Sequence, residues 1–316
     1  MDEFELIRRF FSTGYPQRPD VMLGVGDDSA ICQLERDEEL VSCSDTLVAG
    51  THFPPGLPAD AVAHRALAAN LSDLAAMGAS PRWFLLAIAL PQAEPDWLEQ
   101  FSSGLARLAA RYQVALIGGD TVRGPLSVTI TALGSVPTGT AVHRSGAVDG
   151  DLIYVTGPCG DAGRAWQALA GGATLAAQDP CYQRFAYPEP RVSEGLALRG
   201  LASAMIDVSD GLHVDLERLL AASGVGATAR AQDVPLSPAL VDQVGLQAAR
   251  DLALTGGDDY ELCFSLAQSR AKDLARLSVD WLCPPVCIGQ VVAEPGLSWQ
   301  LDGQDLLSPA PAFRHF

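Results

Sequence analysis

The stretch Gly24-Val25-Gly26-Asp27-Asp28-Ser29-Ala30 places two adjacent carboxylates directly after a flexible glycine pair. Similar aspartates recur beside glycines or near apolar runs, at Asp45, Asp73, Asp120, Asp207, Asp210, Asp258 and Asp259. Strands and helices commonly end where an apolar run meets a glycine. We therefore predict that the fold gathers many of these aspartates around divalent cations, and that the cations hold phosphate groups.

The composition points in the same direction. The chain has 316 residues, of which 48% are hydrophobic, so it can bury the core of one large domain or two ordinary ones. Its formal net charge of −17 disfavours a nucleic-acid or anionic-membrane surface, because such surfaces attract basic patches. Lys272 is the only lysine, so we expect phosphate binding to depend on metal ions and arginines.

The compartment is predicted from the chain start, the apolar runs and the cysteines. The acidic start Met1-Asp2-Glu3-Phe4-Glu5 has no signal-peptide core, and no apolar run reaches the roughly 18 residues of a membrane span. The 7 cysteines contain no CxxC pair, so neither a zinc site nor a disulfide framework is indicated. These features predict reduced thiols in a cytoplasmic protein that does not bind membranes.

Hydrophobic periodicity predicts an α+β chain with two α/β domains, 1–140 and 141–316. Predicted helices cover 4–11, 60–77, 95–112, 161–169, 191–199, 211–222 and 238–244, with a further helix that ends at 277. Predicted strands cover 39–43, 82–90, 114–117, 126–136, 151–156, 204–208, 225–229, 260–266, 286–292 and 297–301. We expect Asp60 to be the N-cap of the helix 60–77.

Two of the aspartates have informative surroundings. Asp73 lies inside an apolar, alanine-rich helix and shares a face with Asn70, three residues away. Gly118-Gly119-Asp120 sets bare backbone N–H groups beside a carboxylate, which can approach a polyphosphate and its metal closely. An aspartate beside a glycine could instead simply form a turn, and Asp73 could be an ordinary side chain on the solvent face of its helix. No P-loop motif occurs, and Asp27 puts negative charge where a dinucleotide-binding loop would hold pyrophosphate.

The stretch Asp207-Val208-Ser209-Asp210-Gly211 allows two interpretations. Ser209 or Asp210 can cap the predicted helix 211–222, but a cap leaves Asp207 unexplained. Arg144 can bind a phosphate with two parallel hydrogen bonds or can be an ordinary surface arginine. His52 can contact a substrate or be solvated, and no Ser-His-Asp or Cys-His order supports nucleophilic catalysis.

Taken as a series, these stretches resemble the thiamine-monophosphate kinases of the aminoimidazole-ribonucleotide synthetase superfamily. The order and spacing of the matching segments span nearly the whole chain. The segments are Gly24–Asp28, Ser44–Val48, His52-Phe53, Asn70–Gly78, Gly118–Thr121, Arg144–Gly146, Asp207–Gly211 and Gly256–Glu261.

The resemblance implies a superfamily-type N-terminal domain that binds ATP and Mg²⁺. The sheet of this domain would join the sheet of a partner in a homodimer, and a C-terminal α/β domain would complete the active site. The implied reaction is the ATP-dependent phosphorylation of thiamine monophosphate to thiamine diphosphate by direct in-line transfer. This is the last step of thiamine diphosphate synthesis.

The resemblance also assigns roles, residue by residue. Several Mg²⁺ ions would be held by Asp27, Asp45, Asp73, Asp120, Asp207 and Asp210, with Ser44 and the Cys43 backbone nearby. ATP would contact Gly119, Asp120, Arg144 and Ser209, with Asp120 and Asp210 carrying the catalytic role. Thiamine monophosphate would contact His52, Asp258, where relatives often carry glutamate, and either Phe313 or Phe316.

Two alternatives stay open. Selenophosphate, formylglycinamidine and hydrogenase-maturation relatives also use ATP with acidic metal sites, although a selenide enzyme would carry a reactive cysteine nearer the N-terminus than Cys32. The chain could also be a non-catalytic binder of thiamine phosphates or nucleotides. So complete a set of metal aspartates argues against a binder, and nucleotide turnover would distinguish the two.

Overall fold

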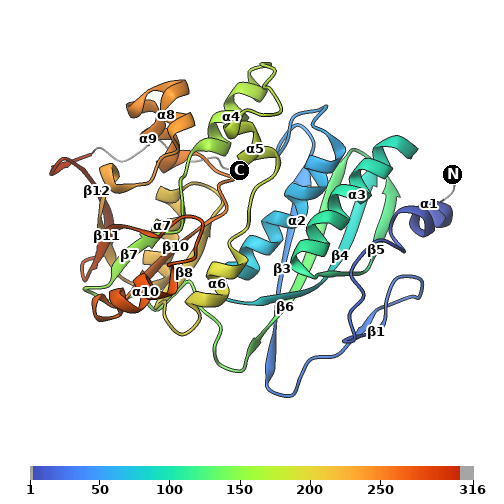
Figure 1. The fold of residues 1–316 in the computed structure, drawn as a ribbon, viewed down its shortest axis with the longest axis horizontal. Coiled ribbons are helices and arrows are strands. Elements are labelled where there is room, and N and C mark those ends of the chain that lie inside the picture. Colours follow the sequence, from blue (N-terminus) through green and yellow to red (C-terminus); the bar gives the residue numbers. More distant parts are fainter. Residues whose placement is uncertain (1–2, 307–316) are drawn as a thin grey trace. The chain divides into compact units, whose positions relative to one another are not determined.

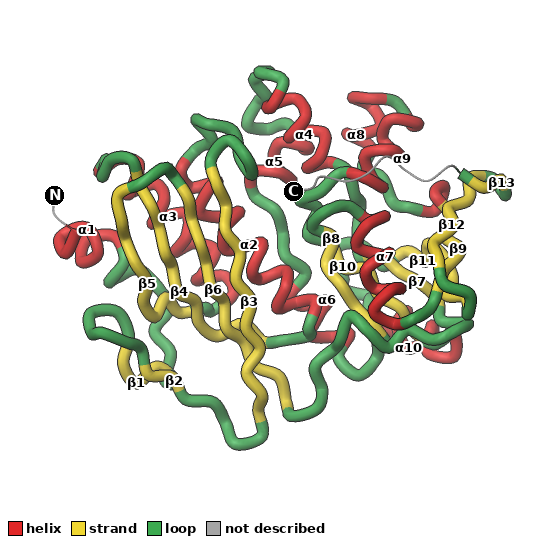
Figure 2. Tube along the Cα trace, turned by 180° about the vertical axis from the view of Figure 1, so that it is seen from behind, coloured by secondary structure: helices red, strands yellow, loops and turns green. Residues whose placement is uncertain are grey.

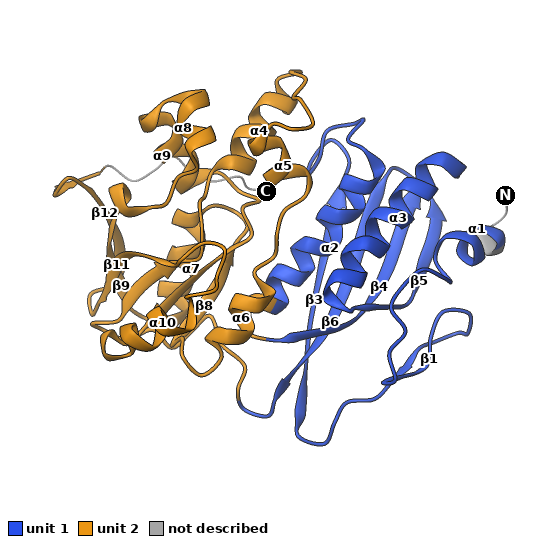
Figure 3. Ribbon diagram, viewed as in Figure 1, with its two compact units in different colours: residues 1–74, 79–139 blue, residues 75–78, 140–316 orange. Residues whose placement is uncertain are grey.

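The computed structural model describes residues 3–306, which divide into two compact units (Figure 3). The first unit comprises the described residues up to Leu74 and the segment Ala79–Gly139. The second unit takes Ala75–Gly78, at the end of a long helix, and the described residues from Thr140 onward. Each unit builds its own β-sheet, so each is described separately.

The first unit is a four-stranded sheet with helices on one face (Figures 1 and 2). The strand order is β3 (Glu38–Val48), β6 (Ser127–Pro137), β4 (Ser80–Leu90) and β5 (Ala115–Arg123), and only β4 and β5 are parallel. Helices α2 (Ala59–Ala76) and α3 (Pro95–Tyr112) cover one face. The remaining elements are α1 (Glu3–Phe10), β1 (Val21–Leu23) and β2 (Ile31–Cys32).

Period-two alternation explains which face of this sheet the helices cover. Phe84, Leu86 and Ile88 of β4 are buried, whereas Ala87 between them is exposed. The other face carries hydroxyl pairs, with side-chain hydrogen bonds between Ser44 and Thr131 and between Thr46 and Thr129. The even-numbered residues of β3 around Thr46 therefore point to the open face of the sheet, which the helices do not cover.

The prediction that aspartates mark the ends of strands is wrong for Asp45 and Asp120. β3 and β5 extend well past the predicted 39–43 and 114–117, so both aspartates lie within strands. Continuous pairing is the reason, because β6 pairs with β3 from Glu38 to Val48 and β4 pairs with β5 as far as Arg123. Short sequence windows contain no information about these distant partners.

The expected helix cap at Asp60 is also wrong. α2 begins at Ala59, and its first backbone bond runs from the Val62 amide to the Pro58 carbonyl at 3.0 Å. Asp60 therefore lies in the first turn, where its carboxylate accepts a hydrogen bond from Arg107 of α3 at 2.9 Å.

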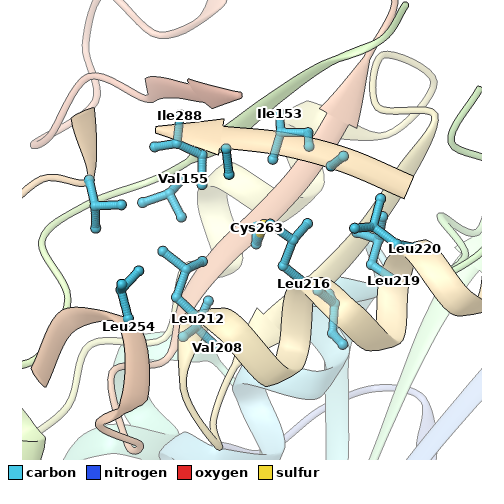
Figure 4. Packing of buried hydrophobic residues seen from close by; sticks show 14 of the residues in the cluster. Ile153, Val155, Val208, Leu212, Leu216, Leu219, Leu220, Leu254, Cys263 and Ile288 are labelled. Carbon is cyan, nitrogen blue, oxygen red and sulfur yellow. The ribbon is translucent and has the colours of Figure 1, made fainter. Parts of the chain in front are cut away.

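The second unit is built on a seven-stranded sheet. Its order is β13 (Gln304–Asp305), β12 (Gly296–Leu301), β9 (Gly226–Arg230), β11 (Val286–Val292), β7 (Leu152–Val155), β10 (Glu261–Leu266) and β8 (Ala204–Val208). Only β9 and β12 are parallel. Helix α7 (Leu212–Ser223) lays Leu212, Leu216 and Leu219 on the sheet near Cys263 (Figure 4).

The other helices of this unit are short. They are α4 (Asp161–Ala170), α5 (Pro180–Ala186), α6 (Val192–Leu198), α8 (Pro238–Val244), α9 (Leu246–Thr255) and α10 (Ala271–Leu277), with 3₁₀ turns at Ala231–Asp233 and Gln268–Arg270. The sequence patterns gave no indication of α9, because Gly245 separates it from α8 by a single residue. Gly245 has a φ of 80°, which only glycine adopts readily.

A buried ionic cluster lies within the second unit, centred on Glu261 of β10. Its carboxylate accepts hydrogen bonds from Arg191 at 2.6 and 2.7 Å, from Arg184 at 2.6 Å and from Thr156 at 2.6 Å. Burial alone would raise the pKa of Glu261, but the charges and hydrogen bonds of Arg191 and Arg184 outweigh it and lower that pKa. Glu261 is therefore ionised and fully paired.

Candidate active site

A cavity of about 480 Å³ lies in the first unit beside β5. Asp27 and Asp28 of the opening stretch line it together with the Gly118–Thr121 segment of β5, which includes Asp120. The apolar part of its lining consists of Ile7, Phe11, Val25, Leu86 and Leu116. The cavity thus joins two predicted metal ligands, Asp27 and Asp120, to an apolar wall.

Gly119 lies in β5 opposite Leu86 of β4. Its φ is +155°, and a Cβ built there would lie 1.8 Å from the Leu86 carbonyl oxygen. No side chain fits this position, so the backbone of β5 remains accessible beside Asp120.

Replacing Gly119 with alanine is expected to destabilise the first unit by roughly 2 kcal/mol or more, because the added methyl must push β5 away from β4. Gly124, which follows β5, is the matched control, since its added Cβ would only touch Ala89 at 3.4 Å. Urea midpoints of the two variants provide the comparison. Equal midpoints would show that β5 accommodates the methyl group.

A second acidic group joins β3 to α2. Cys43 and Asp45 are two residues apart on β3 and therefore face the same side. The Cys43 thiol donates a hydrogen bond to the Asn70 carbonyl oxygen of α2 at 3.3 Å. Burial, and then the charges of Asp73 and Asp45, raise the pKa of the Cys43 thiol well above its ordinary value. The three side chains are therefore close enough to interact electrostatically. Ser44 lies on the opposite, open face, where it meets Thr131.

Among the described residues, no three His, Cys, Asp or Glu side chains are already gathered as a metal site. Mg²⁺ needs less from a protein, because one or two carboxylates commonly hold it together with substrate phosphates and water. Asp45 with Asp73, and Asp27 with Asp120, offer oxygen ligands of this kind. These donors therefore fit Mg²⁺ that is bound together with a phosphate ester.

His52 follows β3 in the loop that begins at Ala49. Its Nδ1 accepts a hydrogen bond from the Val48 amide at 3.0 Å, and its carbonyl oxygen accepts one from Arg65 at 3.2 Å. The hydrogen bond from the Val48 amide makes Nδ1 the acceptor, so in the neutral imidazole the proton is on Nε2.

In the second unit, two loops carry the predicted site residues. Asp207 is the last residue but one of β8, Ser209 and Asp210 follow the strand directly, and Asp258 lies just before β10. The Asp258 amide donates to the Ser209 carbonyl oxygen at 2.8 Å, and the Tyr260 amide donates to the Val208 carbonyl oxygen at 2.8 Å. The fold therefore brings Asp207, Ser209, Asp210 and Asp258 together.

Asp258 has a constrained conformation. It and Tyr260 both have left-handed backbones, with φ of 67° and 52°. The Tyr260 hydroxyl donates to Asp258 Oδ1 at 3.0 Å, and Tyr260 is itself buried. The phenol thereby orients the carboxylate that was predicted to bind substrate.

Neither Ser209 nor Asp210 caps α7. Gly211 is the N-cap residue of α7 and makes no side-chain capping bond, and Asp210 pairs with Arg218 at 2.5 Å. Instead, the carboxylate of Asp215 accepts hydrogen bonds from the backbone amides of Ser209, Asp210 and Gly211 at the start of this helix. Burial raises the pKa of Asp215 to about 6, although those amides oppose the shift.

The sequence motifs assigned no role to Asp215, Arg218 or Tyr260, although Tyr260 lies within the matching segment Gly256–Glu261. The one available signal was the place of Asp215 between the buried Leu212 and Leu216 of an amphipathic helix. Arg144 lies exposed in the segment between β6 and β7. Phe313 and Phe316 lie outside the described residues.

Comparisons with known proteins bear directly on this arrangement. The AIR synthase related protein N-terminal domain family matches residues 26–136, and the C-terminal domain family matches residues 148–302. A thiamine-monophosphate kinase of Escherichia coli (strain K12) is 45% identical over 99% of this chain and 98% of its own length. The chain belongs to the thiamine-monophosphate kinase family.

Solved structures agree with this family membership. The crystal structure of thiamine-monophosphate kinase from Stenotrophomonas maltophilia K279a matches with a TM-score of 0.86 and 44% identity, covering 92% of this chain and 93% of the other. AaThiL complexed with AMPPCP and TMP matches with a TM-score of 0.79 and 27% identity, covering 92% of both chains. The expected superfamily and two-domain α+β fold are thereby confirmed. None of the described helices is long and apolar enough to cross a membrane.

Proposed function

We propose that this chain phosphorylates thiamine monophosphate with ATP to give thiamine diphosphate. The observation that carries the proposal is full-length membership of the kinase family, in which one relative is solved with AMPPCP and TMP. The acidic loops of this chain fit that chemistry, because carboxylates lie beside bare backbone both at Gly119 and at Gly211.

The reaction asks little acid–base chemistry of the protein. The acceptor is already a phosphate, whose oxygen needs no deprotonation at neutral pH, so a general base is dispensable. When bound, Mg²⁺ ions neutralise the two approaching anions and align them for in-line transfer. The ions would be held by Asp27, Asp45, Asp73, Asp120, Asp207 and Asp210, with the backbone of Cys43 and Ser44 nearby; the Ser44 hydroxyl itself lies on the open face of the sheet.

The other residues bind and orient the two substrates. Gly119, Arg144 and Ser209 would hold ATP, with the apolar wall of the β5 cavity available to its base. The Asp258 carboxylate, oriented by Tyr260, would attract the cationic thiazolium, with His52 and Phe313 as further contacts. Such an anionic site suits a chain of net charge −17.

Product formation is the direct test. Thiamine monophosphate and ATP are incubated with the protein, with and without Mg²⁺, and the products are separated by chromatography. Mg²⁺-dependent thiamine diphosphate supports the proposal. Nucleotide binding without turnover would favour a binder, and ATP consumption with another acceptor, such as selenide, would favour a different superfamily reaction.

We further propose that the kinase is a cytoplasmic homodimer. All seven cysteines are free thiols, the state that a reducing compartment maintains. The dimer contact would use the open face of the four-stranded sheet, away from α2 and α3. There Val48, Ser127, Ala89 and Val122 pair in register across all four strands, and Val122 is 50% exposed.

Val122→Glu is expected to convert the dimer to monomer, because it would bury a charge in the contact. Light scattering coupled to size-exclusion chromatography measures the mass. Leu282→Glu is the control, since Leu282 is 83% exposed in the second unit. A dimeric Val122→Glu protein would place the contact elsewhere, and a monomeric wild type would exclude the dimer.

A further inference from the structure

Asp215 makes an unusual set of contacts at the start of α7. Its Oδ2 accepts hydrogen bonds from three consecutive backbone amides, those of Ser209 at 3.0 Å, Asp210 at 2.9 Å and Gly211 at 3.2 Å. The carboxylate is only 1% exposed. Asp215 thus holds the backbone of the loop that carries Ser209 and Asp210 from its buried side.

Arg218, one turn further along α7, completes the arrangement. Its Nη1 lies 2.7 Å from Asp215 Oδ1 and 2.5 Å from Asp210 Oδ2. One guanidinium therefore joins the buried carboxylate to the solvent-facing one. Asp215 consequently fixes both the backbone of the loop and, through Arg218, the side chain of Asp210.

The same loop also supports the segment that carries Asp258. The Ser209 carbonyl oxygen accepts the Asp258 amide at 2.8 Å, and a Cβ on Gly257 would come within 2.6 Å of that oxygen. A Cβ on Gly211 would lie 3.1 Å from the Thr255 backbone. The two loops are packed so tightly that displacement of one must displace the other.

A residue that merely stabilised α7 would not need this geometry. Asp215 is buried on α7, as are the apolar Leu212, Leu216 and Leu219 of the same helix, and a leucine at position 215 would be buried without the desolvation cost of a carboxylate. A buried carboxylate is compensated here only because three amides and a guanidinium converge on it. The compensation is therefore specific to this form of the 209–211 backbone.

We propose that Asp215 is a positioning residue, which with Arg218 holds the Ser209–Gly211 backbone in the form that presents Ser209 and Asp210 to metal-bound nucleotide. The inference rests on the proposed function, because that function assigns ATP to Ser209 and Mg²⁺ to Asp210. Asp215 itself touches neither metal nor substrate, and acts only through the loop.

Asp215→Asn is the most informative variant. The amide side chain keeps the shape, but its single oxygen can serve the three backbone amides or Arg218, and its NH₂ group repels whichever donor remains. We expect kcat to fall roughly 10–100-fold, as when a residue that supports metal ligands is removed, with the Mg²⁺ requirement raised and the KM for thiamine monophosphate changed less. Arg218→Met removes the ion pairs of Arg218 with the Asp210 and Asp215 side chains and leaves the hydrogen bonds from the backbone amides to Asp215 intact.

Two readouts do not depend on turnover. Hydrogen exchange should show faster exchange of the 209–211 amides in Asp215→Asn, and calorimetry should show weaker binding of Mg²⁺ with the ATP analogue AMPPCP. Glu217→Gln, on the same helix and exposed, is the charge-matched control and should behave as wild type. Thermal melting separates loop effects from unfolding, and Arg218→Met replaces Asp215→Asn if the latter does not fold.

The outcomes separate the two proposals. Faster amide exchange with unchanged kcat, Mg²⁺ requirement and AMPPCP affinity would overturn the positioning role and leave the kinase intact. A wild type that makes no thiamine diphosphate would overturn the proposed function, and the positioning role would then be decided by Mg²⁺·AMPPCP binding alone. Unchanged AMPPCP binding in both Asp215→Asn and Arg218→Met would reject it in that case as well.

Discussion

Replacing either Asp120 or Asp210 with asparagine is expected to lower kcat by about 10²–10³-fold while the fold stays intact. Both changes remove one negative charge and keep the shape of the side chain. Asp120 lines the β5 cavity, and Asp210 lies on the loop held by Asp215. Each carboxylate is proposed to hold Mg²⁺ against the transferring phosphate, so its loss should act on the transition state more than on substrate binding.

The measurement is steady-state thiamine diphosphate formation over a range of Mg²⁺ concentrations. Asp37→Asn in the first unit and Asp280→Asn in the second are matched controls, because both carboxylates are exposed. Thermal melting of all four variants should be close to that of wild type. Near-normal rates in both Asp120→Asn and Asp210→Asn would refute the proposed metal-binding role of these aspartates.

Glu261→Gln is expected to destabilise the second unit by roughly 3–5 kcal/mol, because it removes the buried carboxylate with which both Arg191 and Arg184 form ion pairs. Glu261 has no exposed side-chain surface, and the Arg191 side chain is only 5% exposed, so water cannot replace the lost partner. Since whole domains are stable by about 5–15 kcal/mol, this single change consumes much of that margin. Urea denaturation, followed by tryptophan fluorescence, measures it.

Glu294→Gln is the control, because Glu294 is exposed just after β11 and should leave the midpoint unchanged. The folded protein lowers the pKa of Glu261, so its contribution is fully present above the unfolded pKa and is lost as pH falls through the folded value. The difference between wild type and Glu261→Gln should therefore shrink in acid. A difference that stays constant in acid, or a normal midpoint for Glu261→Gln, would count against the charged cluster.

The two predictions are physically connected. Glu261 pairs with Val208 across β10 and β8, so the buried cluster lies next to Asp207 of β8 and to the loop that carries Asp258. Destabilising variants at Glu261 should therefore also lose activity, but in proportion to the unfolded fraction. Asp210→Asn should instead lose activity without unfolding.

Much of this molecule was predictable from local sequence. The helix at 95–112 and the strands at 204–208 and 286–292 appear with the predicted bounds, because their apolar periodicity is strong and Pro or Gly stands near their ends. The series of aspartate motifs also led to the kinase family, since the series depends on order along the chain and not on contacts.

Tertiary structure alone decided how the aspartates are held. Asp45 and Asp120 lie inside strands because β6 and β4 extend the pairing past the points where local pattern ended. Ser209 and Asp210 do not cap α7, because the carboxylate of Asp215 accepts hydrogen bonds from their amides instead. The local sequence around Asp215 predicted a helix but not this contact. Sequence thus determined which carboxylates the chain has and in what order. Pairing and burial determined which of them meet, because those energies come from partners distant in the chain.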